Sequence, residues 1–380
     1  MLAQAVFMKE NKSMIERVGI IGGGQLGQML TEAALPLGFQ VTALETSANC
    51  PAGQFGAKIL EGEISDRAAI TQLAEQTDVL TWEIEHIPSA HLLNLAEAGI
   101  DVQPHPQTLE VIQDKLHQKR MLQHLGVPVA PFSATLDESA FTGGGPYVIK
   151  ARRGGFDGRG NLVVDKLDDP RIKEFLPEGG VYAEQKLNFE KEISVVAARS
   201  RNGDIASYPL VETVHKDNIC NLVIAPAEVS EQVSEQAAEI ARTILEHTHG
   251  AGIFAIEMFA VDGTVLVNEI APRVHNSGHH TIEANVTSQF EQHIRAITGM
   301  PLGSTESRTP AAAMINILGK EDGPLVRDGL EKILALPDTH PHLYGKSPRL
   351  QRKIGHITVL GSSTEKVKEI AEQARKELTI

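Results

Sequence analysis

Cysteine is scarce in this chain of 380 residues, and long hydrophobic runs are missing. The only cysteines are Cys50 and Cys220, and neither belongs to a CxxC pair. A disulfide framework or a zinc ribbon is therefore unsupported, and a reducing cytoplasm is the expected location. No apolar stretch approaches the roughly 20 residues needed to cross a bilayer.

An excess of basic residues is also missing, because the formal net charge is −14 at pH 7. Such a chain is poorly suited to non-specific binding of nucleic acid or of an anionic membrane. We expect neither partner, and we expect any phosphate site to be a local basic cluster. The length suits two or three globular domains. Residues 1–14 are predicted to be a disordered extension, since they are too short and too polar for a secretory signal.

A β-hairpin is predicted in the second half of the chain. Residues 253–260 and 264–270 are rich in apolar and β-branched side chains. They are joined at Asp262-Gly263, a strong signal for a tight turn.

Two carboxylates, Glu257 and Glu269, lie among apolar neighbours in this hairpin. A regular two-residue turn pairs Glu257 with Asn268 and separates the carboxylates onto opposite faces. A three-residue loop or a bulge brings both to one face as diagonal neighbours. We expect the second arrangement, because two adjacent carboxylates can hold magnesium on nucleotide phosphates. The alternative is a pair of unrelated strand glutamates.

A polar loop that ends in glycine follows the hairpin. It supplies one fixed cation, one titratable donor and two neutral donors, a composition suited to holding an anion. These residues are Arg273, His275, Asn276 and Ser277. A zinc site with His279 and His280 is the alternative, although no cysteine or HExxH motif accompanies them.

A glycine-rich segment follows the short apolar run at residues 17–21 near the N-terminus. Gly22, Gly24 and Gly27 match GxGxxG, and Glu45 ends the next predicted strand. Such a loop lets a phosphate approach a helix N-terminus, which favours a dinucleotide-binding oxidoreductase as one hypothesis.

Helices alternate with short strands in the first third of the chain, which predicts a parallel α/β unit. Helices are predicted at residues 61–75 and 108–125, and a strand at residues 79–82. Glu83 follows that strand, where open α/β sheets bind ligands. It is otherwise an ordinary carboxylate at a helix start.

A second glycine-rich segment begins after a predicted strand that ends at Lys150. Residues 152–160 hold four glycines and three arginines, which is typical of a mobile cationic loop over phosphates. The GK[ST] ending of a Walker A motif is missing. A flexible hairpin tip is the alternative.

Further candidate sites lie on either side of the hairpin. A strand at residues 181–187 contains Glu184, and the next strand begins near Glu192, which is placed to bind a ribose; a solvated edge is the alternative. Near the C-terminus, four cations and a histidine fall within eleven residues and predict a second phosphate site or a solvated loop. They are Lys346, Arg349, Arg352, Lys353 and His356.

Taken together, these motifs resemble the ATP-grasp superfamily, and more specifically its 5-(carboxyamino)imidazole ribonucleotide synthases. The matching segments include GGGQLGQM, TWEIEHI, ARRGGFDGRGN, VNEIAPRVHNSGHHT and RKIGH. The resemblance covers about residues 15–378 and implies an α/β (α+β) ATP-grasp fold. It implies a Rossmann-like pre-ATP-grasp domain at residues 15–112, an ATP-grasp domain at 113–300 with a lid at about 130–190, and a small barrel-like C-terminal domain at 301–380.

The resemblance also implies which residues bind ATP and magnesium. Magnesium would be held by Glu257 and Glu269. Family members often carry arginine at the position of Lys115 and lysine at that of Arg159, which changes the donor geometry. The ATP site would comprise Lys115, Lys150, Gly155, Phe156, Asp157, Gly158, Arg159, Gly160, Asn161, Glu184, Gln185, Lys186, Leu187, Glu192, His215, Asn268 and Glu269.

By the same resemblance, the glycine-rich N-terminal loop would face 5-aminoimidazole ribonucleotide and not a dinucleotide. The ribonucleotide site would comprise Gln25, Leu26, Glu83, Asn276, Ser277, Lys346, Arg352 and Lys353. The catalytic residues would be Arg273, His275, Lys353 and Asp157.

The implied reaction is ATP-dependent carboxylation of this ribonucleotide by bicarbonate through carboxyphosphate, in a cytoplasmic homodimer that uses ATP and magnesium. Three alternatives remain open. One is a formate-dependent formyltransferase of glycinamide ribonucleotide, one is the oxidoreductase, and one is a nucleotide-binding module without catalysis.

Overall fold

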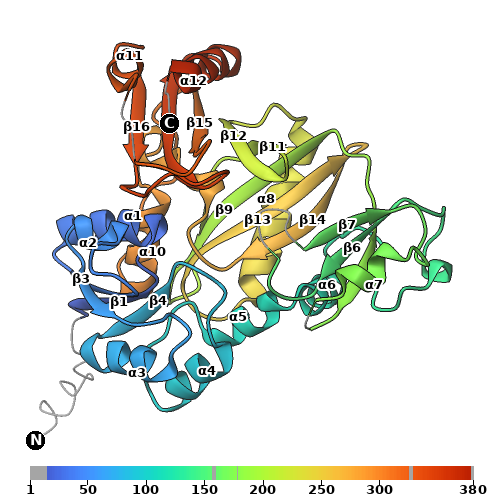
Figure 1. Ribbon diagram of the computed structural model, residues 1–380, viewed down its shortest axis with the longest axis horizontal. Coiled ribbons are helices and arrows are strands. Elements are labelled where there is room, and N and C mark those ends of the chain that lie inside the picture. Colours follow the sequence, from blue (N-terminus) through green and yellow to red (C-terminus); the bar gives the residue numbers. More distant parts are fainter. Residues whose placement is uncertain (1–14, 156–159, 178, 325–327, 378–380) are drawn as a thin grey trace, which may run out of the picture.

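The computed structural model describes residues 15–155, 160–177, 179–324 and 328–377 (Figure 1). The predicted extension at residues 1–14 lies outside this part of the chain. The described residues form an N-terminal sheet, a long central sheet and a separate lid sheet. No helix within these ranges is both long enough and apolar enough to cross a membrane.

The N-terminal sheet is parallel, with the strand order β3-β2-β1-β4. The prediction of a helix over residues 61–75 is wrong at its start. Lys58–Glu61 pairs with β2 as a strand, and the helix begins only after Asp66, whose carboxylate accepts a hydrogen bond from the backbone of Ala68. The elements are β1 (Arg17–Ile21), α1 (Gln25–Ala34), η1 (Leu35–Leu37), β2 (Gln40–Glu45), α2 (Pro51–Gln54), β3 (Lys58–Glu61), α3 (Arg67–Gln76), β4 (Val79–Trp82) and α4 (Ser89–Glu97).

Two helices, α5 (Pro106–Gln113) and α6 (Lys115–His124), connect this sheet to the rest of the chain. The sequence predicted one continuous helix here. The break falls at Asp114, which has an extended backbone and whose carboxylate accepts hydrogen bonds from the amides of Leu116 and His117. An aspartate that caps a new helix in this way competes with continuation of the old one.

The lid sheet has the strand order β5-β8-β6-β7 and projects to one side of the molecule (Figure 1). It has its own small core, which includes Tyr147, Ile149 and Ala183. A separate core is what lets such a unit hold its shape away from the central sheet. The elements are β5 (Phe132–Ser133), η2 (Glu138–Ala140), β6 (Tyr147–Ala151), β7 (Asn161–Val164), α7 (Arg171–Phe175) and β8 (Val181–Gln185).

The central sheet follows the order β14-β13-β9-β11-β12-β15-β17-β16, with β10 paired to β9. The C-terminal strands therefore continue the sheet through the pairing of β12 with β15. Its elements are β9 (Lys191–Arg199), β10 (Ile205–Ser207), β11 (Val211–Lys216), β12 (Ile219–Ala225), α8 (Glu231–His247), β13 (Gly252–Val261), β14 (Thr264–Ala271), η3 (Asn276–Gly278), α9 (Thr281–Ala284), α10 (Gln289–Thr298), β15 (Ala311–Leu318), α11 (Leu330–Leu334), β16 (Thr339–Leu343), β17 (Lys353–Gly361) and α12 (Thr364–Glu377).

Helices cover both faces of the central sheet. Apolar side chains of α8 pack with those of β9, β13 and β14 in one core, and those of α10 pack with α1 in another. The second core joins the N-terminal domain to the central sheet, so that the carboxyl ends of β1 and β4 lie beside the end of β14 (Figure 1).

A buried histidine fastens the same junction. His293 on α10 is fully buried, accepts a hydrogen bond from the amide of Ile253 at 3.1 Å, and contacts the hydroxyl of Thr81 at 2.9 Å. Because Nδ1 is the acceptor, Nε2 carries the proton and donates it to Thr81. Burial lowers the pKa of His293 to about 3, so the ring is neutral near pH 7.

We predict that His293 makes folding stability depend on pH. An unfolded histidine has a pKa of about 6.5, so below this value the unfolded chain binds a proton that the folded chain refuses. Stability is therefore lost as the pH falls from about 6.5 towards about 3. His293→Gln can keep both hydrogen bonds without titrating.

Denaturant unfolding at about pH 7 and about pH 5.5 measures this effect. The parent should lose about 1 kcal/mol more than His293→Gln over that interval. Equal losses of unfolding free energy in the two proteins would contradict a neutral buried His293. The contributions of the other histidines cancel in this comparison, because both proteins contain them.

Candidate active site

A bulge in the β13–β14 hairpin brings the two predicted carboxylates together. The turn has two residues, Asp262 and Gly263, both with positive φ, and the pairing runs regularly as far as Met258. The register then shifts, and Glu257 pairs directly with Glu269. The prediction of a shared face is confirmed, but the carboxylates are direct cross-strand partners and not diagonal neighbours.

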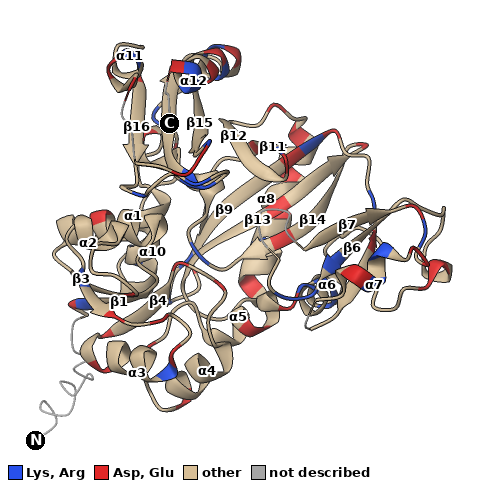
Figure 2. Ribbon diagram, viewed as in Figure 1, with Lys and Arg blue, Asp and Glu red and all other residues tan. Residues whose placement is uncertain are grey.

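Figure 2 shows basic residues on α6 and β6, beside the hairpin of β13 and β14. Lys115 of α6 contacts Glu269, and Lys150 of β6 contacts Asn268. Burial and the neighbouring charge of Glu269 raise the pKa of Glu257 above its usual range. Burial also acts to raise the pKa of Glu269, but Lys115, whose Nζ lies 2.5 Å from Glu269, holds it below its usual range. Two partly buried carboxylates on adjacent strands repel each other, and a shared cation relieves that repulsion.

A third carboxylate, which is buried, connects the lid to the hairpin. Glu184 on β8 lies 3.1 Å from Nζ of Lys119 and 2.8 Å from Nζ of Lys150, and Tyr182 donates to it at 2.9 Å. Burial opposes ionisation, but the two ammonium groups lower the pKa of Glu184 to about 2. Lys150 also donates to Asn268, the bulged residue, at 2.9 Å.

Lys119 was not among the residues selected from the sequence. It is 1% exposed and donates to the carbonyl of Val267 at 3.0 Å. Its position one helical turn after Lys115 places both lysines on one face of α6, which is the signal that sequence analysis had available.

The end of β6 is tied to the start of α6. Arg152 contacts Asp114 through Nη2 at 2.6 Å and Nε at 3.1 Å, and its carbonyl accepts the amide of Lys115 at 2.8 Å. This bidentate pair anchors the described start of the cationic lid loop beside the carboxylates.

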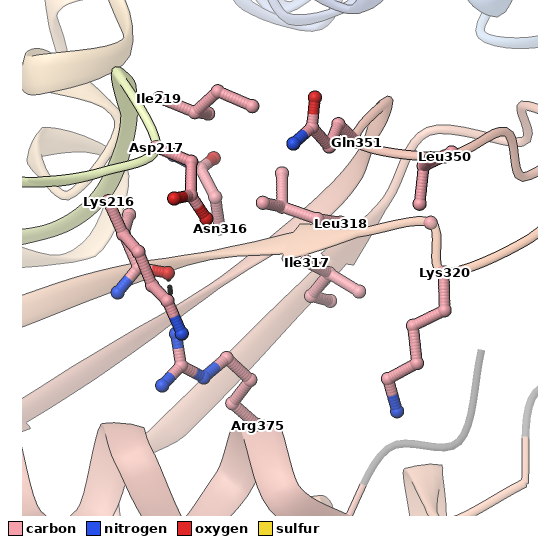
Figure 3. A pocket seen from close by; sticks show the side chains of 12 residues that line it. Lys216, Asp217, Ile219, Asn316, Ile317, Leu318, Lys320, Leu350, Gln351 and Arg375 are labelled. Carbon is pink, nitrogen blue, oxygen red and sulfur yellow. Dashed lines mark hydrogen bonds between the residues drawn. The ribbon is translucent and has the colours of Figure 1, made fainter.

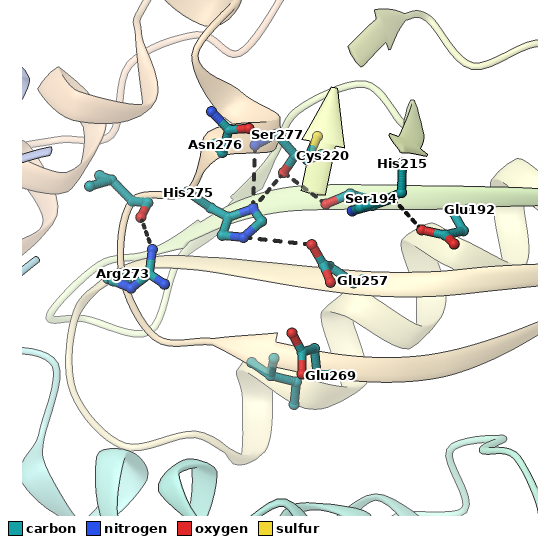
Figure 4. A network of polar contacts seen from close by, with 12 residues as sticks. Glu192, Ser194, His215, Cys220, Glu257, Glu269, Arg273, His275, Asn276 and Ser277 are labelled. Atoms are coloured by element: carbon teal, nitrogen blue, oxygen red, sulfur yellow. Dashed lines mark hydrogen bonds and ion pairs between the residues drawn. The ribbon is translucent and has the colours of Figure 1, made fainter. Parts of the chain in front are cut away.

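The loop after β14 forms a chain of polar contacts (Figure 4). Nδ1 of His275 lies 3.0 Å from Oγ of Ser277, which lies 2.9 Å from Oγ of Ser194 on β9. The side chain of Gln289 accepts a hydrogen bond from the amide of His275 at 2.9 Å and donates one to the carbonyl of His275 at 2.7 Å. The side chain of His275 is therefore held with Nε2 3.6 Å from Glu257.

His275 is a neutral donor at this position. Burial, followed by the charges of Arg273 and Lys353, lowers its pKa to about 3. Nδ1 accepts a hydrogen bond from the amide of Ser277 at 3.3 Å, so Nε2 carries the proton and faces the carboxylate pair.

Arg273 links the carboxylate pair to the N-terminal domain. Its Nε lies 2.8 Å from Glu85, and its pKa is raised because Glu85, Glu83 and Glu269 outweigh the effect of burial. Glu85 was overlooked in the sequence, although it follows β4 only two positions after Glu83.

Carboxylates occupy the glycine-rich loop before α1. Glu83 accepts hydrogen bonds from the amides of Gly24 at 2.5 Å and Gly27 at 2.6 Å, and Glu45 accepts the amide of Gly23 at 3.2 Å. These amides are the groups that would hold the pyrophosphate of a dinucleotide. The oxidoreductase hypothesis therefore loses its main support.

Three of the predicted ribonucleotide residues, Gln25, Glu83 and Lys346, lie at the same loop. Lys346 contacts the amide oxygen of Gln25, and burial lowers the pKa of Lys346 to about 8 against the opposing charge of Glu83. Arg352 and Lys353 also act electrostatically on Lys346. Leu26 differs, because its side chain is buried in the apolar core.

The remaining candidates occupy varied positions. His215 pairs with Glu192, and the amides of Asn276 and Asn316 contact each other. Gln185 donates to lid carbonyls, while Lys186 is exposed. Gly155, Gly160 and Asn161 border a segment outside the described residues, which contains Phe156, Asp157, Gly158 and Arg159.

The zinc alternative has no support in this part of the chain. Nδ1 of His280 contacts the carbonyl of Ser277, and Nδ1 of His279 contacts Gln289. Among the described residues, no three histidine, cysteine or acidic side chains are grouped so that they can hold a metal ion.

Lys119→Met tests the buried lysine network. Removing this ammonium leaves Glu184 with one fewer partner in a buried setting, and we expect a loss of about 3 kcal/mol in unfolding free energy. The matched control is Lys173→Met on the exposed face of α7, which should change stability by less than about 0.5 kcal/mol. The unfolding free energy is measured by denaturant unfolding. An equal change in both variants would contradict the network.

Three domain families match the chain. The ribonucleotide synthetase preATP-grasp domain matches residues 15–113, the ATP-grasp domain residues 120–290, and the phosphoribosylaminoimidazole carboxylase C-terminal domain residues 312–370. The domain boundaries inferred from the sequence stay predictions.

Curated relatives fall into two groups. The phosphoribosylaminoimidazole carboxylase of Ogataea methanolica is 43% identical over 363 residues, which cover 92% of this chain and 67% of the relative. This chain spans 64% of the corresponding Candida albicans protein. The N5-carboxyaminoimidazole ribonucleotide synthase of Mycobacterium tuberculosis is 40% identical over 370 residues, which cover 94% of this chain and 86% of the relative.

Solved structures match across nearly the whole chain. N5-carboxyaminoimidazole ribonucleotide synthetase from Thermotoga maritima is 43% identical, with a TM-score of 0.86 and coverage of 96% of this chain and 99% of that one. The Aspergillus clavatus synthase in complex with ADP and 5-aminoimidazole ribonucleotide is 35% identical, with a TM-score of 0.86 and coverage of 96% and 98%. The expected fold class is confirmed, and this chain belongs to the N5-carboxyaminoimidazole ribonucleotide synthase family of ATP-grasp proteins.

Proposed function

We propose that the protein is an ATP-dependent carbon–nitrogen ligase that carboxylates 5-aminoimidazole ribonucleotide with bicarbonate in purine biosynthesis, releasing ADP and phosphate. The observation that carries this proposal is the position of Arg273. Its Nε lies 2.8 Å from Glu85 of the N-terminal domain, and the charges of Glu83 in that domain and of Glu269 in the hairpin also raise its pKa. One cation is therefore shared by the proposed ribonucleotide side and the proposed ATP side.

The ATP side is supported by the cations and amides around the hairpin. Lys115 and Lys150 are placed to bind phosphates, and the paired Glu192 and His215 to bind the ribose. Magnesium fits the adjacent carboxylates of Glu257 and Glu269, since hard divalent cations prefer carboxylate oxygens. When bound there, it would neutralise phosphate charge.

The first step joins bicarbonate to the γ-phosphoryl group of ATP. A bicarbonate oxygen forms a bond to phosphorus while the bond to the ADP oxygen breaks, giving carboxyphosphate. Arg273 supplies a permanent positive charge to the incoming anion. His275 supplies an uncharged N–H donor from Nε2, because its low pKa keeps the ring neutral.

The second step moves the carboxyl group to the ribonucleotide. The exocyclic amine forms a bond to the carboxyl carbon, phosphate leaves, and the amine loses a proton. Lys346, Arg352 and Lys353 are proposed to hold the ribonucleotide phosphate, with Gln25, Leu26, Glu83, Asn276 and Ser277 around the sugar and base. Asp157, proposed to accept the amine proton, lies outside the described residues.

Several finer points belong to the same proposal. Bicarbonate as the carboxyl donor, magnesium, a cytoplasmic location and a homodimer rest on the sequence motifs and on the family. The formyltransferase of glycinamide ribonucleotide remains the nearest alternative, because it shares the general plan of the fold.

ADP release by the purified protein distinguishes these reactions. We expect release with ATP and magnesium to be stimulated by 5-aminoimidazole ribonucleotide plus bicarbonate, and not by glycinamide ribonucleotide plus formate. Stimulation by the second pair alone would move the assignment to formyl transfer. If neither pair stimulated ADP release, the result would favour a nucleotide-binding module without catalysis.

Glu269→Gln tests the proposed metal site. The amide keeps the size of the side chain but loses the charge, so kcat/KM should fall by at least about 100-fold, with weaker magnesium-dependent ATP binding. Glu246→Gln on the exposed face of α8 is the matched control and should leave both unchanged. Turnover of Glu269→Gln within about threefold of the parent would refute the metal assignment.

A further inference from the structure

A cavity of about 330 Å³ lies between the β11–β12 turn, the end of β15 and α12 (Figure 3). The residues proposed to bind ATP and the ribonucleotide do not line it. Its volume falls in the range of small-molecule pockets. The cavity is therefore large enough for a ligand of its own.

The lining of this pocket combines an apolar wall with cations. Ile219, Leu318 and Leu350 supply the wall, and Lys216, Lys320 and Arg375 supply the positive charge. Asp217 is the one acidic side chain among the described residues that line it.

Some cations of this part of the described chain are neutralised by a carboxylate, and these three are not. Arg273, Arg295 and Lys191 each pair with a carboxylate. No carboxylate of the described chain lies within 4.0 Å of the nitrogens of Lys216, Lys320 or Arg375, and Arg375 instead donates to the amide oxygen of Asn221. A cluster of positive charge without matching carboxylates attracts anions.

The pocket also adjoins residues of the proposed active site. Gly319 in its wall donates to the carbonyl of Arg352 at 2.9 Å, and its own carbonyl accepts the amide of Gln351 at 2.9 Å. On another side, the amide of Asn316 contacts Oδ1 of Asn276 at 2.7 Å. Residues that line the pocket therefore hydrogen-bond directly to Arg352 and Asn276. A ligand that orders the lining residues can affect both.

We propose that this pocket binds an organic phosphate monoester, with the phosphate on Lys216, Lys320 and Arg375 and an apolar body against Ile219, Leu318 and Leu350. Three cations without a carboxylate partner suit a dianion better than a carboxylate ligand. The apolar wall suits a ligand with an apolar body, which inorganic phosphate lacks. Binding orders the segment that contains Gln351 and Arg352. The inference is independent of the proposed reaction, because binding requires no turnover.

Phenyl phosphate is the probe, with inorganic phosphate as the comparator that lacks the apolar body. Binding to the full chain is measured by calorimetry for the parent, for the double variant Lys320→Gln/Arg375→Gln, and for Lys376→Gln. Lys376 lies on α12 next to Arg375, is exposed and does not line the pocket. We expect the double variant to bind phenyl phosphate at least about tenfold more weakly, and Lys376→Gln to bind it as the parent does.

The proposed ribonucleotide site is the competing location for the probe, so Lys346→Gln is included. Loss of binding in Lys346→Gln but not in the double variant would overturn the proposal. Equal affinity for inorganic phosphate would also overturn it, because the apolar wall would then contribute nothing. Lys320→Gln alone, at an exposed position, checks that a loss in the double variant does not come from misfolding.

Amide hydrogen exchange provides the second readout. Phenyl phosphate should slow exchange in peptides covering residues 319 and 349–353 of the parent, and should not do so in the double variant. Binding without any change in these peptides would refute the link to Arg352.

Discussion

The structure depends on the close approach of two partly buried carboxylates, Glu257 and Glu269. The bulge at Asn268 creates this approach by shifting the register of one strand by one residue. Like charges at direct cross-strand positions are unfavourable unless cations surround them. The surrounding residues follow from this requirement: Lys115 contacts Glu269, and Lys150 holds the bulged Asn268.

The same requirement links the three parts of the chain. The lid reaches the hairpin through Glu184, which gathers Lys119 and Lys150 in a buried network. The N-terminal domain reaches it through Glu85, which pairs with Arg273. Buried ion pairs of this kind contribute little net stability but tolerate few alternative arrangements. They fix the relative positions of groups that would otherwise belong to independent domains, which is what a reaction between two bound substrates requires.

Much of the fold could be predicted from local patterns, whereas the contacts between domains could not. The hairpin follows from side-chain alternation and the Asp262-Gly263 turn. The shared carboxylate face does not, because a regular two-residue turn separates Glu257 from Glu269; it was expected from the chemistry of magnesium and arises from the bulge at Asn268. The helix break at Asp114 was missed because apolar periodicity continues across it, while its capping carboxylate decides the structure. Lys119 and Glu85 were missed because their partners are distant in sequence. The spacing of Lys119 after Lys115 indicates a shared helix face, but it does not reveal burial, because burial of a charge is a tertiary property.

The structure of the protein with magnesium and ADP bound tests the central claim most directly. The account predicts one magnesium ion within about 2.0–2.1 Å of a carboxylate oxygen of Glu257 and of Glu269. It also predicts that Nζ of Lys115 moves from Glu269 to the phosphates. Magnesium bound without either carboxylate, with Lys115 still on Glu269, would contradict the account.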